Sequence, residues 1–449
     1  MLIGNSREAQ GKAEARGLEA KEGAGRTRPR RLLLCLDGVP HEVIVAARGR
    51  GLFERFGEPA RLLSPFPTMT NVALSIMLGA TAPLGYESLY FDRGACCLQG
   101  GVRKYVGRRT PDKIPSSYMD ELDYQEPLPF EFLIYVAPET VWRADMRRFR
   151  ERFRAAPRTR DFFGFLKATD GLLHIRGPRR LQVALESLDR ILREIQNHCG
   201  DETEIVLFSD HGMNLEENRR VHLKSHLERA GYEVAAKLGP ESRGARRRVA
   251  VPAFGLCGYA ALYCADETDV AQVAAALSTL EGVDFGVRRE GGQAVVVEGA
   301  RGAARVERDA TKDDTGAVVS ARYRYEPLSG DPLELAPTLE ALRGAGELDE
   351  RGFAPDAAWL ARTAEHTYPD APANLFASLH EPRVQHTADI LISLRDGYYF
   401  GDAVFSRLAR LAATHGNALR PSSTAFLMST HRALPRHVRA ADAKPFLKD

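Results

Sequence analysis

The chain has 449 residues, 44% of them hydrophobic and 27% charged, and its formal net charge at pH 7 is +2. This length supports one large domain carrying a subdomain or two ordinary domains, and the composition excludes a mostly disordered or fibrous protein. Acidic and basic residues are mixed along most of the chain, so nucleic acid is not the expected partner. No apolar stretch reaches the length that spans a membrane.

Residues 1–30 are rich in Gly, Ala, Glu and Arg and poor in large apolar side chains, which predicts a flexible basic tail. The following apolar run, Leu32 to Leu36, is too short for a signal-peptide core and has no small-residue cleavage site after it. None of the six cysteines belongs to a CxxC pair, and several lie in apolar runs, which favours reduced structural thiols. Together these features lead us to expect a cytoplasmic protein.

Three short apolar runs each end in an acidic residue, and they predict strands buried on both faces of a sheet. They are Arg31 to Asp37, Phe162 to Asp170 and Glu204 to Asp210. Between the second and third runs, Gly177-Pro178 precedes apolar residues at helical spacing from Leu181 to Ile195. A strand, a helix and a strand in this order form a crossover unit, which predicts an α/β fold with a mostly parallel sheet sandwiched by helices. The three acids would meet at the carboxyl edge of that sheet, where ligands of such folds bind.

A small inserted α+β subdomain is predicted at 249–326, within a catalytic core formed by 31–240 and 330–449. Strand-like runs at 260–264, 294–298 and 304–307 flank a helix-like run at 269–280. Helical patterns at 332–343 and 356–366 then lead to a strand candidate at 389–394 and a helix at 402–413, both of which we assign to the core.

Two of the strand-end acids are accompanied by a histidine. His211 follows Asp210 directly, and His174 lies four residues after Asp170. A carboxylate with an imidazole suits a divalent transition metal such as zinc, although Asp before a helix is also a common N-cap. Two such pairs at neighbouring strand ends favour a metal site over two separate caps.

The candidate nucleophile lies in the segment Ser64 to Asn71, which leads into the apolar helix Val72 to Leu78. Either Thr68 or Thr70 would stand at the N-terminus of that helix, where free N–H groups and the helix dipole favour a phosphate. A neighbouring metal could convert the hydroxyl into an alkoxide nucleophile. The alternative is a simple helix cap.

Five motifs occur in an order that resembles the type I phosphodiesterase/nucleotide pyrophosphatase branch of the alkaline phosphatase superfamily. They are Leu36-Asp37-Gly38, Phe66 to Asn71, Asp170 to His174 with Gly177-Pro178, Phe208 to Met213 and Thr414-His415-Gly416. The resemblance covers residues from about 31 to 430, apart from the inserted segment. It implies an alkaline-phosphatase-like fold and hydrolysis of a small-molecule phosphodiester or pyrophosphate through a phosphothreonine intermediate.

The resemblance also implies two divalent metal ions, with zinc preferred and manganese as the alternative. Asp37, Asp210 and His211 would hold one ion together with the Thr70 oxygen, and Asp170, His174 and His415 would hold the other. Thr70 is preferred over Thr68 as nucleophile because it is the later threonine of the family's Phe-Pro-Thr-x-Thr pattern. The family's downstream Asn is replaced near Ser88, so Asn71 is the candidate donor to the phosphoryl oxygen, or else a structural residue.

Several alternatives stay open at this level. His386 is the main rival to His415 as a metal ligand, while His222 and His226 have helical spacing but lie in a polar pattern typical of a surface. The same metals would serve a phosphomonoesterase, phosphonate hydrolase or phosphomutase, and a non-catalytic binding protein is the alternative outside the enzymes. No Cys-x-Pro-Ser-Arg sequence is present, which argues against a sulfatase. We expect the inserted segment to act as a cap that selects the leaving group, and the oligomeric state is left undetermined.

Overall fold

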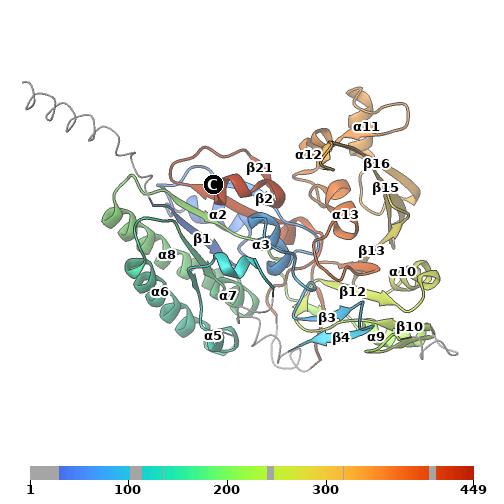
Figure 1. The fold of residues 1–449 in the computed structure, drawn as a ribbon, viewed down its shortest axis with the longest axis horizontal. Helices are drawn as coiled ribbons and strands as arrows, with labels where there is room; N and C mark the ends of the chain where they lie inside the picture. The colour runs from blue at the N-terminus through green and yellow to red at the C-terminus, as the bar shows by residue number, and fades with distance from the viewer. Residues whose placement is uncertain are drawn as a thin grey trace, which may run out of the picture.

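The computed structural model describes residues 30–101, 114–134, 136–239, 247–316, 318–403 and 411–448. The predicted N-terminal tail lies almost wholly outside these ranges, as does most of the predicted helix at 402–413. Two large sheets dominate the described chain, and they lie side by side (Figure 1). No helix within the described ranges is both long and apolar enough to cross a membrane.

The first sheet has seven strands in the order β21-β2-β20-β7-β1-β6-β5. Its centre is parallel, because β1 pairs in parallel with both β6 and β7, and β5 and β21 pair in parallel with β6 and β2. Only β20 runs antiparallel to its neighbours. The strands are β1 Leu32–Leu36, β2 Ala60–Leu63, β5 Tyr124–Gln125, β6 Phe162–Leu166, β7 Ile205–Phe208, β20 Thr424–Ser429 and β21 His437–Arg439. The three predicted apolar strands are therefore confirmed as neighbours in a mostly parallel sheet.

Helices cover both faces of this sheet. Alternate residues of β1 point to opposite sides, so Leu32, Leu34 and Leu36 pack in one hydrophobic cluster and Leu33 and Cys35 in another. The first cluster includes the apolar faces of α2 His41–Arg48, α6 Pro138–Ala155, α7 Ala168–Arg176 and α8 Pro178–Cys199. The second cluster includes α3 Thr70–Leu78 and α16 Lys444–Leu447. The predicted sandwich of helices around the sheet is thus confirmed.

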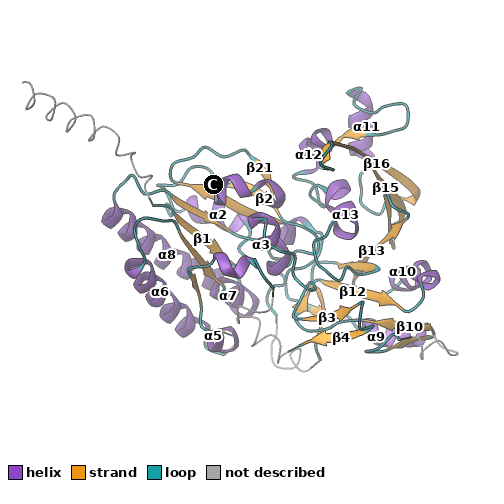
Figure 2. Cartoon of the chain, viewed as in Figure 1, coloured by secondary structure: helices purple, strands orange, loops and turns teal. Residues whose placement is uncertain are grey.

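The second sheet has nine strands in the order β17-β16-β15-β14-β13-β18-β12-β10-β9. They are β9 Tyr232–Val234, β10 Arg247–Ala250, β12 Tyr259–Cys264, β13 Val283–Glu290, β14 Ala294–Gly299, β15 Gly302–Lys312, β16 Val318–Gly330, β17 Ala354–Pro355 and β18 Ile390–Leu394. Five of them, β10, β12, β13, β15 and β16, are labelled in Figure 2. The helices α10 Val270–Ser278, α11 Ala336–Gly344, α12 Asp356–Thr363 and α13 Ala371–His380 accompany it.

The described chain also contains smaller elements. A three-stranded sheet contains β8 Arg219–Arg220, β11 Leu256–Cys257 and β19 Tyr398–Gly401, and a hairpin contains β3 Leu89–Asp92 and β4 Cys97–Gly100. The remaining helices are α5 Leu128–Leu133, α9 Leu223–Arg229 and α15 Arg420–Ser423, with 3-10 turns η1 Tyr118–Glu121, η3 Glu267–Asp269 and η4 Ala440–Asp442. All six cysteines are free, as the sequence predicted.

The second sheet extends beyond the predicted insertion at 249–326. The strand at 390–394, which we had assigned to the catalytic core, lies between β12 and β13 in the middle of the second sheet. The strands β9 and β17 also come from the ranges assigned to the core. The physical reason is that a short apolar run predicts burial on both faces but does not identify the sheet that buries it.

Candidate active site

The three strand-associated acids meet at the carboxyl edge of the first sheet. Asp37 follows β1 directly, and Asp210 lies two residues after β7. Asp170 differs from the prediction, because β6 ends at Leu166 and Asp170 lies in the first turn of α7. His174 lies one turn later on the same helix, so the spacing of the pair places both side chains on one face.

The first cluster of ligating side chains consists of Asp37, Asp210 and His211, all of which are buried. His211 Nε2 lies 3.4 Å from Asp37 Oδ1 and 3.5 Å from Asp210 Oδ2. The other carboxylate oxygen of Asp210, Oδ1, accepts a hydrogen bond of 3.2 Å from the Gly38 N–H. Gly38 adopts a φ of +70°, and a Cβ there would lie 3.1 Å from an oxygen of Asp170, so this position favours glycine for two reasons.

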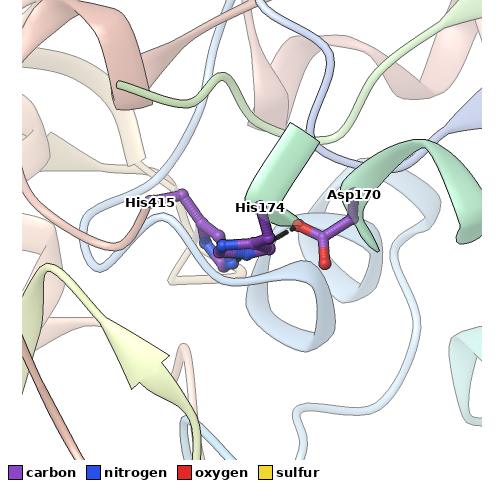
Figure 3. Close-up of side chains that lie close together, drawn as sticks. All are labelled: Asp170, His174 and His415. Atoms are coloured by element: carbon purple, nitrogen blue, oxygen red, sulfur yellow. Dashed lines mark ion pairs between the residues drawn. The ribbon is translucent and has the colours of Figure 1, made fainter. Parts of the chain in front are cut away.

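The second cluster consists of Asp170, His174 and His415, also buried (Figure 3). Asp170 Oδ1 lies 3.2 Å from His174 Nε2 and 3.8 Å from His415 Nε2. The two clusters are adjacent, because the rings of His211 and His415 stack with centroids 4.0 Å apart. All six predicted metal-ligating residues other than Thr70 therefore lie within two neighbouring groups of three.

The proton positions on the three imidazoles follow from their backbone partners. Nδ1 of His174, His211 and His415 lies 2.7, 2.9 and 2.8 Å from the carbonyl oxygens of Ala413, Gly212 and Thr68. A carbonyl only accepts, so each Nδ1 carries the proton and each Nε2 presents a lone pair. This second hydrogen bond is the usual way in which a protein orients a metal-binding histidine.

Each of the three carboxylates in the two clusters has one oxygen without a hydrogen-bond partner in the described part of the chain. Among the described residues, Asp37 Oδ2, Asp170 Oδ1 and Asp210 Oδ2 are buried without a hydrogen bond. Buried acceptors that face other acceptors are costly unless a cation lies between them. Oxygen and imidazole nitrogen donors in groups of three fit divalent zinc or manganese.

Electrostatics point the same way. Burial, together with the nearby carboxylates of Asp210 and Asp170, raises the pKa of Asp37 well above its usual range, and burial raises the pKa of Asp210 to about 6. Burial also lowers the pKa of His211 to about 4 and, together with the His211 ring, the pKa of His415 to about 3. The Asp170–His174 pair differs: against the effect of burial, the His174 imidazole holds the pKa of Asp170 below its usual range, and the Asp170 carboxylate raises the pKa of His174. In the first cluster and at His415, neutral imidazoles lie beside carboxyl groups, and a bound cation would favour the ionised, ligating form of those carboxyl groups.

Thr70 joins the first cluster, whereas Thr68 does not. Thr70 is the first residue of α3, and its Oγ1 lies 3.2 Å from Asp37 Oδ1 and 3.3 Å from His211 Nε2. The hydroxyl of Thr68 is fully buried and accepts a hydrogen bond of 2.8 Å from the Gly416 N–H. The geometry therefore gives Thr68 a structural contact and places the Thr70 hydroxyl among the ligating side chains.

Asn71 follows Thr70 in the first turn of α3, and its Oδ1 accepts a hydrogen bond of 2.9 Å from the Tyr118 hydroxyl. This contact fixes the orientation of the amide, because the oxygen end is held by a donor and the NH2 end is thereby directed elsewhere. Nothing in the sequence pointed to Tyr118, since forty-seven residues separate the two positions.

The other candidate histidines lie outside both clusters. His386 stacks on Tyr90 and accepts a hydrogen bond from the Arg93 N–H. His415, and not His386, lies with Asp170 and His174 in the second cluster. His222 is exposed, as expected, and His226 bonds to the carbonyl oxygen of Ala276.

The sequence matches the profile of the family described as type I phosphodiesterase / nucleotide pyrophosphatase over residues 92–327, which is more than half of the chain. The chain belongs to this family. The matched range contains Asp170, His174, Asp210 and His211, while Asp37, Thr70 and His415 lie outside it. The family's members are phosphodiester- and pyrophosphate-cleaving hydrolases, so the chain is assigned to this class of enzyme.

Solved structures that align over most of the chain were also found. Phosphonoacetate hydrolase from Sinorhizobium meliloti 1021, in complex with phosphonoformate, aligns with a TM-score of 0.48 and 14% identity over 94% of this chain and 95% of that chain. Murine ectonucleotide pyrophosphatase/phosphodiesterase 5 aligns with a TM-score of 0.47 and 12% identity over 93% of this chain and 94% of that chain. No curated protein matched the sequence significantly. Family membership therefore rests on the sequence match and not on these distant structural similarities.

Proposed function

We propose that the protein is a two-metal hydrolase of small-molecule phosphodiesters or pyrophosphates in which Thr70 is the nucleophile. The observation that carries this proposal is the convergence of two buried clusters, each with carboxylate oxygens facing imidazole lone pairs, with the Thr70 hydroxyl inside the first. Asp37, Asp210, His211 and Thr70 would hold one divalent ion, and Asp170, His174 and His415 the other. Zinc is the preferred ion and manganese the alternative.

Bound ions would lower the pKa of the attacking hydroxyl and stabilise charge on the phosphoryl and leaving oxygens. The chain itself supplies the position of the nucleophile and a route for its proton. Thr70 Oγ1 donates toward Asp37 Oδ1 across 3.2 Å, so that carboxylate can take the proton as attack begins. The bond from Oγ1 to phosphorus forms while the bond from phosphorus to the leaving oxygen breaks, and the leaving group departs with that electron pair. Water then hydrolyses the phosphothreonine and restores the hydroxyl.

The N-terminus of α3 can bind the transferred phosphoryl group. Val72 and Ala73 donate to the Met69 carbonyl, and no described backbone hydrogen bond uses the N–H of Thr70 or Asn71. Free N–H groups at a helix N-terminus attract an anion. We assign the Asn71 side-chain NH2 as an additional donor to a phosphoryl oxygen, since Tyr118 holds the other end of that amide.

Metal content and substrate class test this proposal together. Protein purified without chelator should contain about two divalent ions per chain, as expected for two complete ligand sets. It should hydrolyse bis-para-nitrophenyl phosphate or a dinucleotide pyrophosphate faster than para-nitrophenyl phosphate. Faster monoester or phosphonate cleavage would assign one of the alternative activities on the same site. Absence of metal, with no activity after addition of zinc or manganese, would refute the two-metal proposal.

A further inference from the structure

The segment that carries the nucleophile, Ser64 to Thr70, contacts both large sheets. We call the second sheet, the helices α10 to α13 and the loop that follows α13 the second-sheet unit. Its apolar residues Phe66 and Met69 belong to the hydrophobic cluster of the second sheet, where Phe66 packs against Phe285 with ring centroids 6.2 Å apart. The same cluster contains Leu375 and Phe376 of α13. The residues just before Thr70 therefore pack in the core of the second sheet, whereas α3, which begins at Thr70, packs mainly in the core of the first sheet.

One amide side chain connects α13 to this segment. Asn374 Oδ1 accepts from the Phe66 N–H at 2.8 Å, and Asn374 Nδ2 donates to the Ser64 carbonyl at 3.0 Å. The amide thus makes the two hydrogen bonds that a neighbouring strand would make with alternate backbone groups. Asn374 is 9% exposed, so solvent offers little replacement for either bond.

A partly buried arginine completes the contact. Arg383 Nη1 donates to the Phe66 carbonyl at 2.7 Å and to Asn374 Oδ1 at 2.8 Å. The N–H and the C=O of Phe66 are consequently both bound by side chains of the second unit. A charge-assisted donor on a carbonyl is stronger than a neutral one, so this contact is costly to break.

The same segment also touches the metal-ligand residues. Ser64 Oγ donates to the Asp210 carbonyl at 2.6 Å, and the Thr68 N–H donates to the Gly416 carbonyl at 3.3 Å, next to His415. Movement at Ser64 or Phe66 would therefore displace Thr70 relative to the ligands that surround its hydroxyl. A displacement of about 1 Å in a reacting group can cost on the order of a hundredfold in rate.

We propose that Asn374 and Arg383 are positioning residues through which the second-sheet unit sets the place of the Thr70 nucleophile. This inference rests on the proposed role of Thr70. It predicts an effect on the chemical step and not on metal affinity, because neither side chain belongs to a ligand cluster.

The test uses the full chain and variants of these two residues. Asn374→Asp keeps the acceptor for Phe66 but removes the donor to Ser64, and Asn374→Ala removes both. Arg383→Lys keeps a charge and a donor, and Arg383→Met removes both. We expect kcat to fall about 10- to 100-fold in Asn374→Ala and Arg383→Met, as for other outer residues that orient a catalytic group, with smaller losses in the conservative variants. KM and metal content should stay near the native values.

Tyr368→Phe is the matched control. It removes the hydroxyl contacts with Asp284, at 2.8 Å, and with Arg301, but keeps the ring that packs against Phe285, the aromatic neighbour of Phe66. It should lower the melting temperature and leave kcat unchanged. All assays are run well below the melting temperature of each variant, and the phosphorylation step is measured separately by rapid acid quench.

A native kcat in both Asn374 variants and in Arg383→Met would overturn the positioning role. So would a decrease in kcat that is fully explained by a lower metal content or by a smaller folded fraction of the variant. The proposed function fails separately, because its own test is the loss of activity in Thr70→Ala. An inactive Thr70→Ala with fully active Asn374 and Arg383 variants would refute only the present inference. If Asn374→Ala does not fold, Asn374→Asp still decides the question.

Discussion

Replacement of the Thr70 hydroxyl tests the central assignment most directly. In Thr70→Ala the first cluster keeps Asp37, Asp210 and His211, whose ligating atoms lie within 4.8 Å of one another. The second cluster makes no use of Thr70 at all. Most metal binding should therefore persist, while the attacking oxygen is lost.

The expected size of the effect follows from what is removed and what remains. Loss of the nucleophile in a well-studied serine protease costs about 10⁶ in kcat, and the residual rate comes from binding and charge stabilisation. Here the metal-ligand clusters remain, and a water molecule could attack directly, so we expect a loss of about 10⁴ to 10⁶ in kcat. At about 1.36 kcal/mol for each tenfold change, this corresponds to roughly 5 to 8 kcal/mol in the barrier.

Steady-state release of nitrophenol gives the rate, and elemental analysis gives the metal content of the same samples. Thr70→Ser retains the hydroxyl and should keep activity, while acid-quenched native protein should carry its phosphoryl group on the peptide that contains Thr70. Thr68→Val is the neighbouring control. It leaves the Gly416 N–H without its acceptor, which should cost about 1 to 3 kcal/mol in stability without removing the nucleophile. The assignment is wrong if metal-loaded Thr70→Ala retains the native rate, or if the phosphoryl group maps to Thr68.

The remaining predictions concern metal, pH and the contact between the two sheets. Removal of metal by a chelator should lower the melting temperature, and added zinc should restore it, because bound ions stabilise the folded state; an unchanged melting curve would contradict this. Burial raises the pKa of Asp145 to about 8, so between about pH 4 and pH 8 the folded state keeps a proton that the unfolded state has released. The free energy of unfolding therefore decreases as the pH rises through this window. Asp145→Asn can still accept the hydrogen bond from the Tyr124 hydroxyl but has no proton to release. The melting temperature of this variant, relative to that of the native protein, should therefore increase as the pH rises through the window. A difference in melting temperature that does not change with pH would show that the pKa of Asp145 is not raised. Arg439→Ala leaves the buried carboxylate of Asp370 without the arginine that pairs with it. The free energy of unfolding in urea should fall by about 3 to 5 kcal/mol. A fall of less than about 1 kcal/mol would show that the pair contributes no more than a surface ion pair.

The parts of the site that lie close together in sequence were accessible to sequence reasoning. Asp210 and His211 are adjacent, and Asp170 and His174 are one helical turn apart, so local spacing already places each pair together. The start of α3 at Thr70 also follows from an apolar helical run that begins at Val72. The grouping of these pairs into two clusters came from the family resemblance, and the distances in the structure agree with it.

Boundaries and distant polar contacts were not accessible. No glycine or proline separates Leu166 from Ala168, so the sequence shows no break where β6 ends and α7 begins, and Asp170 was read as a strand end. Tyr118 and Asn374 act through hydrogen bonds to residues far away in the chain, and such contacts leave no periodic pattern.

Contacts of the inserted segment with the His415 loop change the expectation for that segment. The Gly258 N–H donates to the His415 carbonyl at 2.6 Å, and Thr414 Oγ1 donates to the Leu256 carbonyl at 2.7 Å. Deletion of 249–326 would remove both contacts and both strands that flank β18, leaving a strand whose residues are all buried without pairing partners. A cap that only overhangs the site could be removed without loss of the chemistry, but this segment supports the loop that carries His415, a proposed metal ligand. Its role in selecting the leaving group must therefore be tested by point variants, because a deletion would remove the catalytic geometry together with any selectivity.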